Sequence, residues 1–317
     1  MSKRYLITGG QGFLGSHLAQ ALADAGHSVW TLDNNSRSSK ELLGHSRITH
    51  LVGDVRRLED YPIPFNRKNS VDCVIHMASV NGTHNFYERP AEVLDVCVKG
   101  MVNVLDACIA FSVPELLLVS SSEVYHEAKT IPTSEEVPFT IPDPRNPRFS
   151  YAAGKQISEM LAIHNANKFR KVDIVRPNNV YGPGMLSGHV IPDLLAKVRA
   201  KDILEIQGDG SETRSFIYID DFTNALMKIL AYEEGYKPHI WHVGTQDEIT
   251  IGELAGKILR LYQRTETVAF NYVRPAGSPE RRCPDISKLE RLLFFQPRVS
   301  LNEGLYRTAK FFDPELA

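Results

Sequence analysis

Hydrophobic and polar residues follow two alternating patterns along the first half of the chain. Short runs rich in β-branched and other apolar residues predict strands at 5–8, 29–32, 48–52, 71–76 and 116–120. Longer segments between them carry apolar residues at helical spacing and predict helices at 12–25, 91–111 and 151–168. Because strands that alternate with helices form βαβ units, the pattern predicts a parallel sheet in a doubly wound α/β fold.

The pattern changes after a sixth apolar run at 172–175. Later elements are shorter and are separated by loops rich in glycine, proline and charge. A run at 240–243 is predicted to return a strand to the first sheet. The chain has 317 residues, more than the roughly 250–300 that share one hydrophobic core, so we expect two parts. The first domain is expected at 1–175, with 214–245 returning to it, and a smaller C-terminal α/β lobe at 176–213 and 246–317.

Composition and charge narrow the possible partners. The formal net charge is -2 and lysines and arginines are scattered, so we expect no nucleic-acid partner. No apolar run approaches the roughly 18–20 residues that span a bilayer, and no signal-peptide pattern opens the sequence, which predicts a cytoplasmic protein without membrane contact. The four cysteines lack the spacing of a metal site or a disulfide framework, so buried thiols and no metal are expected: Cys73, Cys97, Cys108 and Cys283.

A glycine-rich segment, TGGQGFLG at residues 8–15, follows the first predicted strand and opens the first helix. Its glycines let the backbone turn tightly and approach a pyrophosphate at the helix N-terminus, as in Rossmann-type dinucleotide sites. Asp33 follows the second strand, where a carboxylate binds an adenosine ribose and repels a 2′-phosphate; this favours NAD over NADP, although the cation of Arg37 tempers the preference. A glycine turn without a ligand is the alternative.

Ligands of such sheets bind beyond the carboxyl ends of the strands. The residues expected to contact the cofactor from the glycine segment and from the ends of the second, third and fourth strands are Gly9, Gly12, Phe13, Leu14, Gly15, Asp33, Asn34, Asp54, Val55, Met77, Ala78 and Ser79.

Tyr151 and Lys155 are predicted to lie one turn apart on one helix face. A tyrosine normally titrates near ~10, but a neighbouring ammonium and an oxidised nicotinamide both favour the phenolate, so Tyr151 can take a proton from a hydroxyl group. Ser121, at the end of the fifth strand, can share that proton. Taken alone, the Tyr–Lys spacing also fits a surface pair, and the serines also fit a capped turn.

Together these segments resemble the extended short-chain dehydrogenase/reductases, specifically the nucleotide-sugar epimerase/dehydratase/decarboxylase family. The resemblance covers nearly the whole chain and includes, in the family's order, TGGQGFLG, GDV at 53–55, HMAS at 76–79, SSSEVY at 120–125, YAAGK at 151–155, RPNNVYGPG at 176–184, GDGSETRSFIYIDD at 208–221 and RRCPDISK at 281–288.

The resemblance implies roles for individual residues. Ser121, Tyr151 and Lys155 would form the oxidising triad, and Pro177 would adjoin the nicotinamide. A nucleotide-diphosphate sugar would contact Asn179, Val190, Gln207, Arg214 and Arg282 in the second half of the chain. Asn81 is expected at the sugar face from the position of its loop, which matches no subgroup of the family. Three positions depart from the family's usual residues: Cys97 stands for asparagine, His126 for glycine and Ser215 for aspartate.

Glu123 bears on which reaction follows oxidation of the sugar at C4. Side chains alternate along a strand, so Glu123 is expected to share the active-site face with Ser121 while Ser122 faces away. In the family, dehydratases and UDP-glucuronate decarboxylases have a glutamate here, and many C4 epimerases have a small residue. Many dTDP-glucose dehydratases have an aspartate at the position of Ser122. The compact C-terminal part of the chain suits epimerases and decarboxylases.

The sequence therefore predicts an NAD-dependent nucleotide-sugar enzyme with Tyr151 as the base. C4 epimerisation is placed slightly ahead of 4,6-dehydration and UDP-glucuronate-type decarboxylation. An NAD-binding scaffold or redox sensor is the alternative without catalysis. A homodimer is expected through the helices predicted at 91–111 and 151–168.

Overall fold

The computed structural model describes residues 2–38, 44–61, 71–126, 128–200, 203–233, 238–265, 268–273 and 277–316. A seven-stranded sheet, in the order β11-β6-β5-β4-β1-β2-β3, forms its centre, and every neighbouring pair is parallel. The strands are β1 (Arg4–Thr8), β2 (Ser28–Asp33), β3 (Ile48–Val52), β4 (Cys73–His76), β5 (Glu115–Val119), β6 (Lys171–Pro177) and β11 (His239–Val243). The predicted doubly wound α/β fold of Rossmann type is confirmed.

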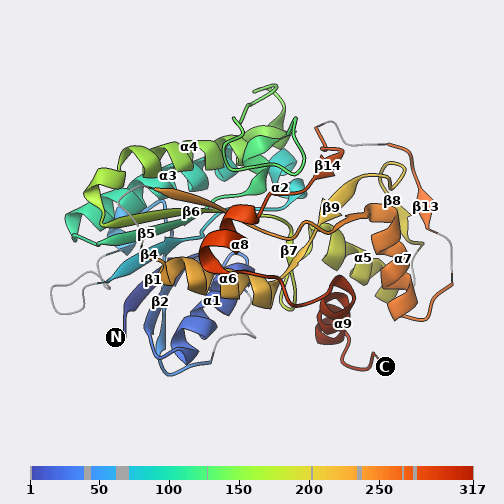
Figure 1. Cartoon of the computed structure of the whole chain (residues 1–317), viewed down its shortest axis with the longest axis horizontal. Helices are drawn as coiled ribbons and strands as arrows, with labels where there is room; N and C mark the ends of the chain where they lie inside the picture. Colours follow the sequence, from blue (N-terminus) through green and yellow to red (C-terminus); the bar gives the residue numbers. More distant parts are fainter. Residues whose placement is uncertain are drawn as a thin grey trace.

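Helices cover both faces of this sheet because its strands are apolar on both sides (Figure 1). In β1, Leu6 packs with side chains of α3 (Pro90–Ala110) and α4 (Ser150–His164), while Ile7 packs with α1 (Phe13–Asp24) and α6 (Ile219–Ala231). The prediction of one helix over 151–168 was slightly long, since a separate 3₁₀ turn covers Ala166–Lys168.

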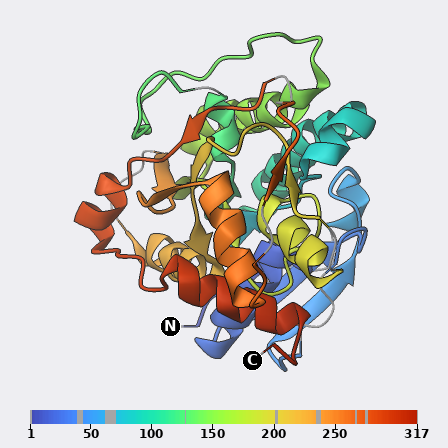
Figure 2. The ribbon, with the colours of Figure 1, turned by 90° about the vertical axis from the view of Figure 1, so that its right-hand side faces the viewer.

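The smaller lobe lies beside the carboxyl ends of the central strands. It contains the helices α5 (Val190–Arg199), α7 (Ile251–Leu261) and α9 (Leu301–Phe312), which lie on one side of the molecule (Figure 2). Its short strands form three small sheets: β7 (Val180–Tyr181) with β10 (Ile217–Tyr218), β9 (Thr213–Ser215) with β12 (Glu248–Thr250) and β14 (Arg281–Arg282), and β8 (Glu205–Ile206) with β13 (Ala269–Phe270). The helix α8 (Ser287–Leu293) packs against β11 at the edge of the central sheet.

One buried cluster runs from the sheet into the lobe. It joins Ile75 of β4 and Leu226 of α6 to Leu195, Leu254 and Leu305 of the lobe helices. The strand predicted at 240–243 does return to the first sheet, as β11 beside β6. The exact division of the chain into two domains stays a prediction.

No helix among the described residues is both long and apolar enough to cross a membrane. The described part of the chain also holds no group of three or more metal-ligating side chains.

Candidate active site

A cavity of about 330 Å³ opens at the carboxyl ends of the central strands. It gathers the side chains and backbone that the sequence singled out for cofactor and catalysis, together with part of the expected substrate set: Gly9, Gly12, Phe13, Leu14, Gly15, Asp33, Asn34, Asp54, Val55, Met77, Ala78, Ser79, Asn81, Ser121, Glu123, Tyr151, Lys155, Pro177, Asn179 and Arg282. Residues 9 and 282 lie far apart in sequence, so the cavity joins the sheet to the C-terminal segment.

The glycine loop packs closely against neighbouring backbone at the N-terminus of α1. Gly9 has φ +68, and a Cβ there would lie 2.8 Å from the Ala78 backbone. A Cβ on Gly15 would collide with the carbonyl oxygen of Gly9. Helix α1 has no side-chain cap at Gly12 within the described structure, so its first N–H groups are available to a pyrophosphate. These features fit NAD.

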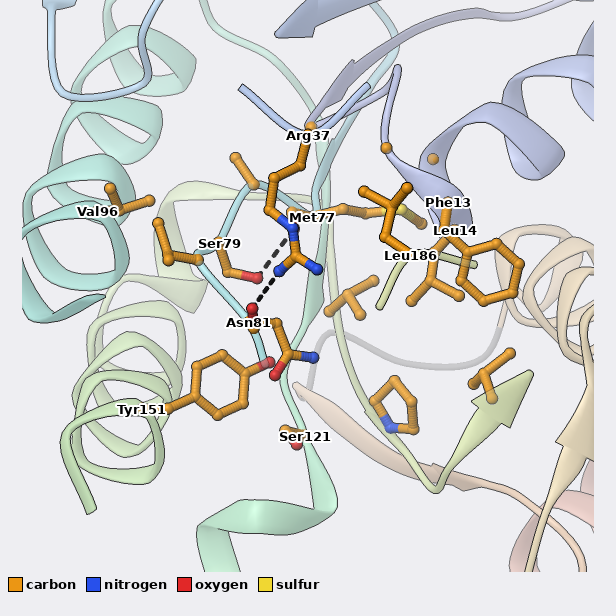
Figure 3. A pocket seen from close by; sticks show the side chains of 18 of the residues that line it. Phe13, Leu14, Arg37, Met77, Ser79, Asn81, Val96, Ser121, Tyr151 and Leu186 are labelled. Carbon is orange, nitrogen blue, oxygen red and sulfur yellow. Dashed lines mark hydrogen bonds between the residues drawn. The ribbon is translucent and has the colours of Figure 1, made fainter. Parts of the chain in front are cut away.

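Asp33 ends β2 beside this loop. Its carboxylate accepts hydrogen bonds from the backbone N–H of Gln11 at 3.0 Å and of Asn35 at 2.8 Å. Arg37, whose cation was expected to temper the NAD preference, instead donates to the carbonyl oxygen of Asn81 (Figure 3) and to that of Ser187. The Asp33 carboxylate is therefore held in place without Arg37.

Tyr151 is the second residue of α4. Its hydroxyl points into the cavity, with Ser79, Asn81 and Ser121 around it (Figure 3). Burial raises the pKa of Tyr151, and hydrogen bonding to Ser79 and Ser121 opposes that shift. The Lys155 ammonium lies 5.8 Å from the centre of the Tyr151 ring and donates to the Val119 carbonyl at 2.8 Å. Tyr151 is therefore placed to exchange a proton with a bound hydroxyl once a cationic ring lies beside it.

Glu123 lines the cavity together with Ser121, as expected, but a turn rather than a strand places it there. Strand β5 ends at Val119, and Ser122–Tyr125 form a 3₁₀ turn in which Ser121 caps the N–H of Glu123. Ser122 lines both this cavity and a smaller one with His126 and Asn178, so the prediction that its side chain faces away stays a prediction. Side chains in a helical turn do not alternate by two as they do in a strand.

The Glu123 carboxylate is bound by two guanidinium groups. Arg282 Nη1 donates to Oε1 at 2.6 Å, and Arg148 Nη2 lies 3.2 Å from both oxygens. Burial raises the pKa of Glu123, but the charges of Arg282 and Arg148 outweigh burial and hold it well below its usual range. Arg282 Nη2 is buried and has no hydrogen-bond partner among the described residues. The three side chains together carry one net positive charge.

Sequence reasoning missed Arg148 and Phe86. Arg148 lies in a 3₁₀ turn at Pro147–Phe149, where no periodic pattern in the sequence indicates the direction of a side chain. Phe86 belongs to the short helix α2 (Thr83–Glu88), and its ring stacks on that of Tyr151. Contacts between segments that far apart carry no signal in a single sequence.

Three of the expected substrate residues are not among those that line the cavity. Val190 is the first residue of α5, Gln207 is exposed after β8, and Arg214 of β9 donates to the carbonyls of Thr213 and Glu280. Their role in nucleotide binding stays a prediction.

The departures from the family residues have packing roles. Cys97 is buried under α4, where a Cβ on Gly154 would lie 2.7 Å from the Cys97 Cβ. Ser215 accepts a hydrogen bond from Asn178 at 2.8 Å, and the His126 ring contacts Phe149 edge to face.

Comparisons with known proteins agree with this geometry. Residues 5–244 match the NAD dependent epimerase/dehydratase family. The chain belongs to this family. NAD is its cofactor, and the chain is an enzyme of a family whose members modify nucleotide-sugars.

Individual relatives differ in their reactions. A dTDP-4-dehydro-6-deoxy-D-allose reductase of a Streptomyces species is 34% identical over 319 residues, covering 97% of this chain and 95% of its own. A UDP-N-acetyl-alpha-D-glucosaminuronate decarboxylase of Bacillus cytotoxicus is 34% identical over 331 residues, covering 98% of each chain. The solved structure of epimerase Mth375 from Methanothermobacter thermautotrophicus has a TM-score of 0.90 and 30% identity, covering 99% of this chain and 93% of that one.

Proposed function

We propose that the protein decarboxylates the sugar of a nucleotide-diphosphate uronic acid through transient oxidation at C4. The observation that carries this proposal is the arrangement of Arg282, Glu123 and Arg148 beside Tyr151. A buried guanidinium with an unpaired N–H, in a cluster of net positive charge, suits an anionic group on the sugar. A carboxylate on C5 is such a group, next to the carbon that Tyr151 would act on.

The same cluster argues against 4,6-dehydration. A C5 base must accept a proton from carbon, and a carboxylate whose pKa is held well below its usual range by two arginines is a weak base. C4 epimerisation, placed first from the sequence, is compatible with the triad but has no use for a cation at C5. The similarity to the UDP-N-acetyl-alpha-D-glucosaminuronate decarboxylase of Bacillus cytotoxicus supports the choice.

Tyr151 and Ser121 would carry out the proton transfers of this reaction. NAD, held by the glycine loop and Asp33, would supply reversible hydride transfer at C4. Tyr151 takes the proton of the C4 hydroxyl, and Ser121 donates a hydrogen bond to the same oxygen. The ketone at C4 makes the C5 carboxylate a β-keto acid, so the C5–C6 bond breaks and its electron pair moves onto the C4 oxygen, where Tyr151 and Ser121 stabilise the charge. One proton is taken up at C5 as carbon dioxide leaves.

Arg282 would bind the carboxylate before it leaves. Its Nη1 is engaged by Glu123 at 2.6 Å, and its Nη2 remains for the substrate. Arg148 is buried and would hold the Glu123 carboxylate in place through its hydrogen bonds. Asn81 and Asn179 line the same cavity and are proposed sugar contacts, with Val190, Gln207 and Arg214 proposed for the nucleotide.

A panel of UDP-, dTDP-, GDP- and CDP-linked uronic acids and neutral hexoses tests the proposal. With the NAD-loaded protein, mass spectrometry and NMR are expected to detect loss of carbon dioxide from a uronic acid. A product of unchanged mass with inverted C4 would establish the epimerase instead, loss of water a dehydratase, and consumption of added NADH a reductase. Turnover of none of the panel would favour the NAD-binding scaffold.

We also propose a homodimer through α3 and α4. These helices pack against each other and leave Leu94, Val102, Ile157 and Met160 partly exposed, with exposed fractions of 36% to 50%. Paired copies would cover these side chains in a helical interface. The cytoplasmic location expected from the sequence is likewise a proposal, which cell fractionation tests.

A further inference from the structure

The loop at 80–83 and helix α2 position an aromatic ring in the site. Asn81 fixes the loop, since its side-chain oxygen accepts from the Gly82 N–H at 2.7 Å and its carbonyl accepts from the Asn85 side chain at 2.6 Å. Gly82, with φ +105, then turns the chain into α2. The helix buries Phe86, which is 2% exposed and lines the cavity.

The Phe86 ring lies nearly parallel to the Tyr151 ring. The ring centres are 5.0 Å apart and the planes differ by 13°. These two rings form a small buried cluster with Val93 and Cys97 of α3, separate from the two large clusters of the sheet. Tyr151 is therefore enclosed by side chains of α2 and α3 as well as by its own helix.

Phe86 also contacts the arginine behind Glu123. The Arg148 guanidinium carbon lies 5.3 Å from the centre of the Phe86 ring, while Arg148 Nη2 binds both oxygens of Glu123. The Phe86 ring thus contacts both Tyr151 and Arg148, and Arg148 in turn binds the Glu123 carboxylate.

We propose that Phe86 is a positioning residue for the reaction, which holds the Tyr151 ring in the plane from which its hydroxyl reaches the substrate. The stack restricts rotation of the phenol, and the buried ring excludes water from its face. Displacement of a reacting group by ~1 Å costs up to about a hundredfold in rate, so a single wall residue can control turnover without contacting the reacting atoms.

The first test needs no substrate. Tyrosine labelled with carbon-13 at the ring edges reports ring flipping by NMR, and the Tyr151 signals are those missing from Tyr151→Phe. In the NAD-loaded wild type we expect slow flipping with separate signals for the two edges. Phe86→Leu should merge them, whereas Phe169→Leu, which removes another buried ring from a different cluster at the opposite end of β6, should not.

The second test measures turnover and rests on the proposed oxidation by Tyr151. Phe86→Leu is expected to lower kcat by about tenfold while KM for the nucleotide-sugar changes less than twofold. Phe169→Leu should keep both constants. Because the proposed reaction returns the hydride to the sugar, turnover is followed as carbon dioxide released. A wild type that releases none from any nucleotide uronic acid contradicts the proposed function and leaves the ring-flip test to decide on Phe86.

Unchanged ring flipping and unchanged kcat in Phe86→Leu would overturn the proposal. If that variant does not fold, as judged by NAD content and melting temperature, Phe86→Met replaces the ring with a flexible side chain of similar volume. Phe86→Met is expected to reproduce both changes, and wild-type behaviour in it would equally overturn the role of the stack.

Discussion

At the scale of single residues, we expect Asp33 to decide between NAD and NADP. Its carboxylate is held by the N–H groups of Gln11 and Asn35, so it cannot turn away from a ribose at the end of β2. We expect the wild type to bind NAD more tightly than NADP and Asp33→Ala to lose that preference, because the charge that repels a 2′-phosphate is gone. Calorimetric titration with both nucleotides measures this. Tighter NADP binding by the wild type, or an unchanged preference in the variant, would assign the discrimination to another residue.

The ion pairs of Glu123 predict how the stability of the fold depends on pH. Because its pKa is lower in the folded protein than in the unfolded chain, it stabilises the fold above the unfolded value of about 4.3, and that contribution is lost as pH falls toward the folded value. Glu123→Gln leaves two buried arginines without their carboxylate and should lower the free energy of unfolding by about 3 kcal/mol at pH 7.

Urea unfolding of Glu123→Gln and wild type at pH 7 and below pH 4 checks this pH dependence. The difference between the two proteins should shrink in acid, because the unfolded wild-type chain takes up a proton at this carboxylate while the folded protein does not. Glu303→Gln, on an exposed face of α9, is the matched control and should behave as wild type at both pH values. A loss of stability that is the same at both pH values would mean that the charge of Glu123 is not what holds the cluster.

At the scale of elements, the partly exposed apolar residues of α3 and α4 lead us to expect a homodimer. Met160→Glu places a charge on their partly exposed face, where Met160 is 50% exposed, and should convert a dimer to a monomer because a buried unpaired charge is costly. Light scattering after size-exclusion chromatography measures the mass. Phe294→Glu, at a residue 85% exposed after α8, serves as control and should leave the mass unchanged. A wild type that is already monomeric at micromolar concentration would contradict the interface.

The helices and strands also show which features of the structure could be predicted from the sequence. The buried strands of a parallel sheet are continuous apolar runs, so β1, β2 and β5 were predicted to within a residue at most bounds. The glycine loop and the Tyr151–Lys155 spacing are local and were equally accessible. The 3₁₀ turn at Ser122–Tyr125, which places Glu123 in the cavity with Ser121, was not, because the apolar run does not show that β5 ends at Val119. Phe86 and Arg148 meet Tyr151 and Glu123 through tertiary contacts that have no local signal.

At the scale of the whole molecule, the sheet and the lobe share a buried cluster that includes Ile75 and Leu254. Parts joined through a common core unfold together, so we expect one calorimetric transition, raised by several degrees when NAD is in large excess over its Kd. Scanning calorimetry with and without NAD measures both. Two transitions, with NAD shifting the lower or the upper one alone, would mean that the lobe is an independent folding unit.

A nucleotide uronic acid with deuterium at C4 and carbon-13 in its carboxylate tests the proposed reaction most directly. Mass spectrometry of a single turnover is expected to find deuterium on the bound cofactor, labelled carbon dioxide, and finally a product with deuterium again at C4. Tyr151→Phe should keep NAD bound but release labelled carbon dioxide about 10²–10⁴-fold more slowly. A cofactor that never acquires deuterium, or a product that retains all of its carbon-13, would contradict decarboxylation through oxidation at C4.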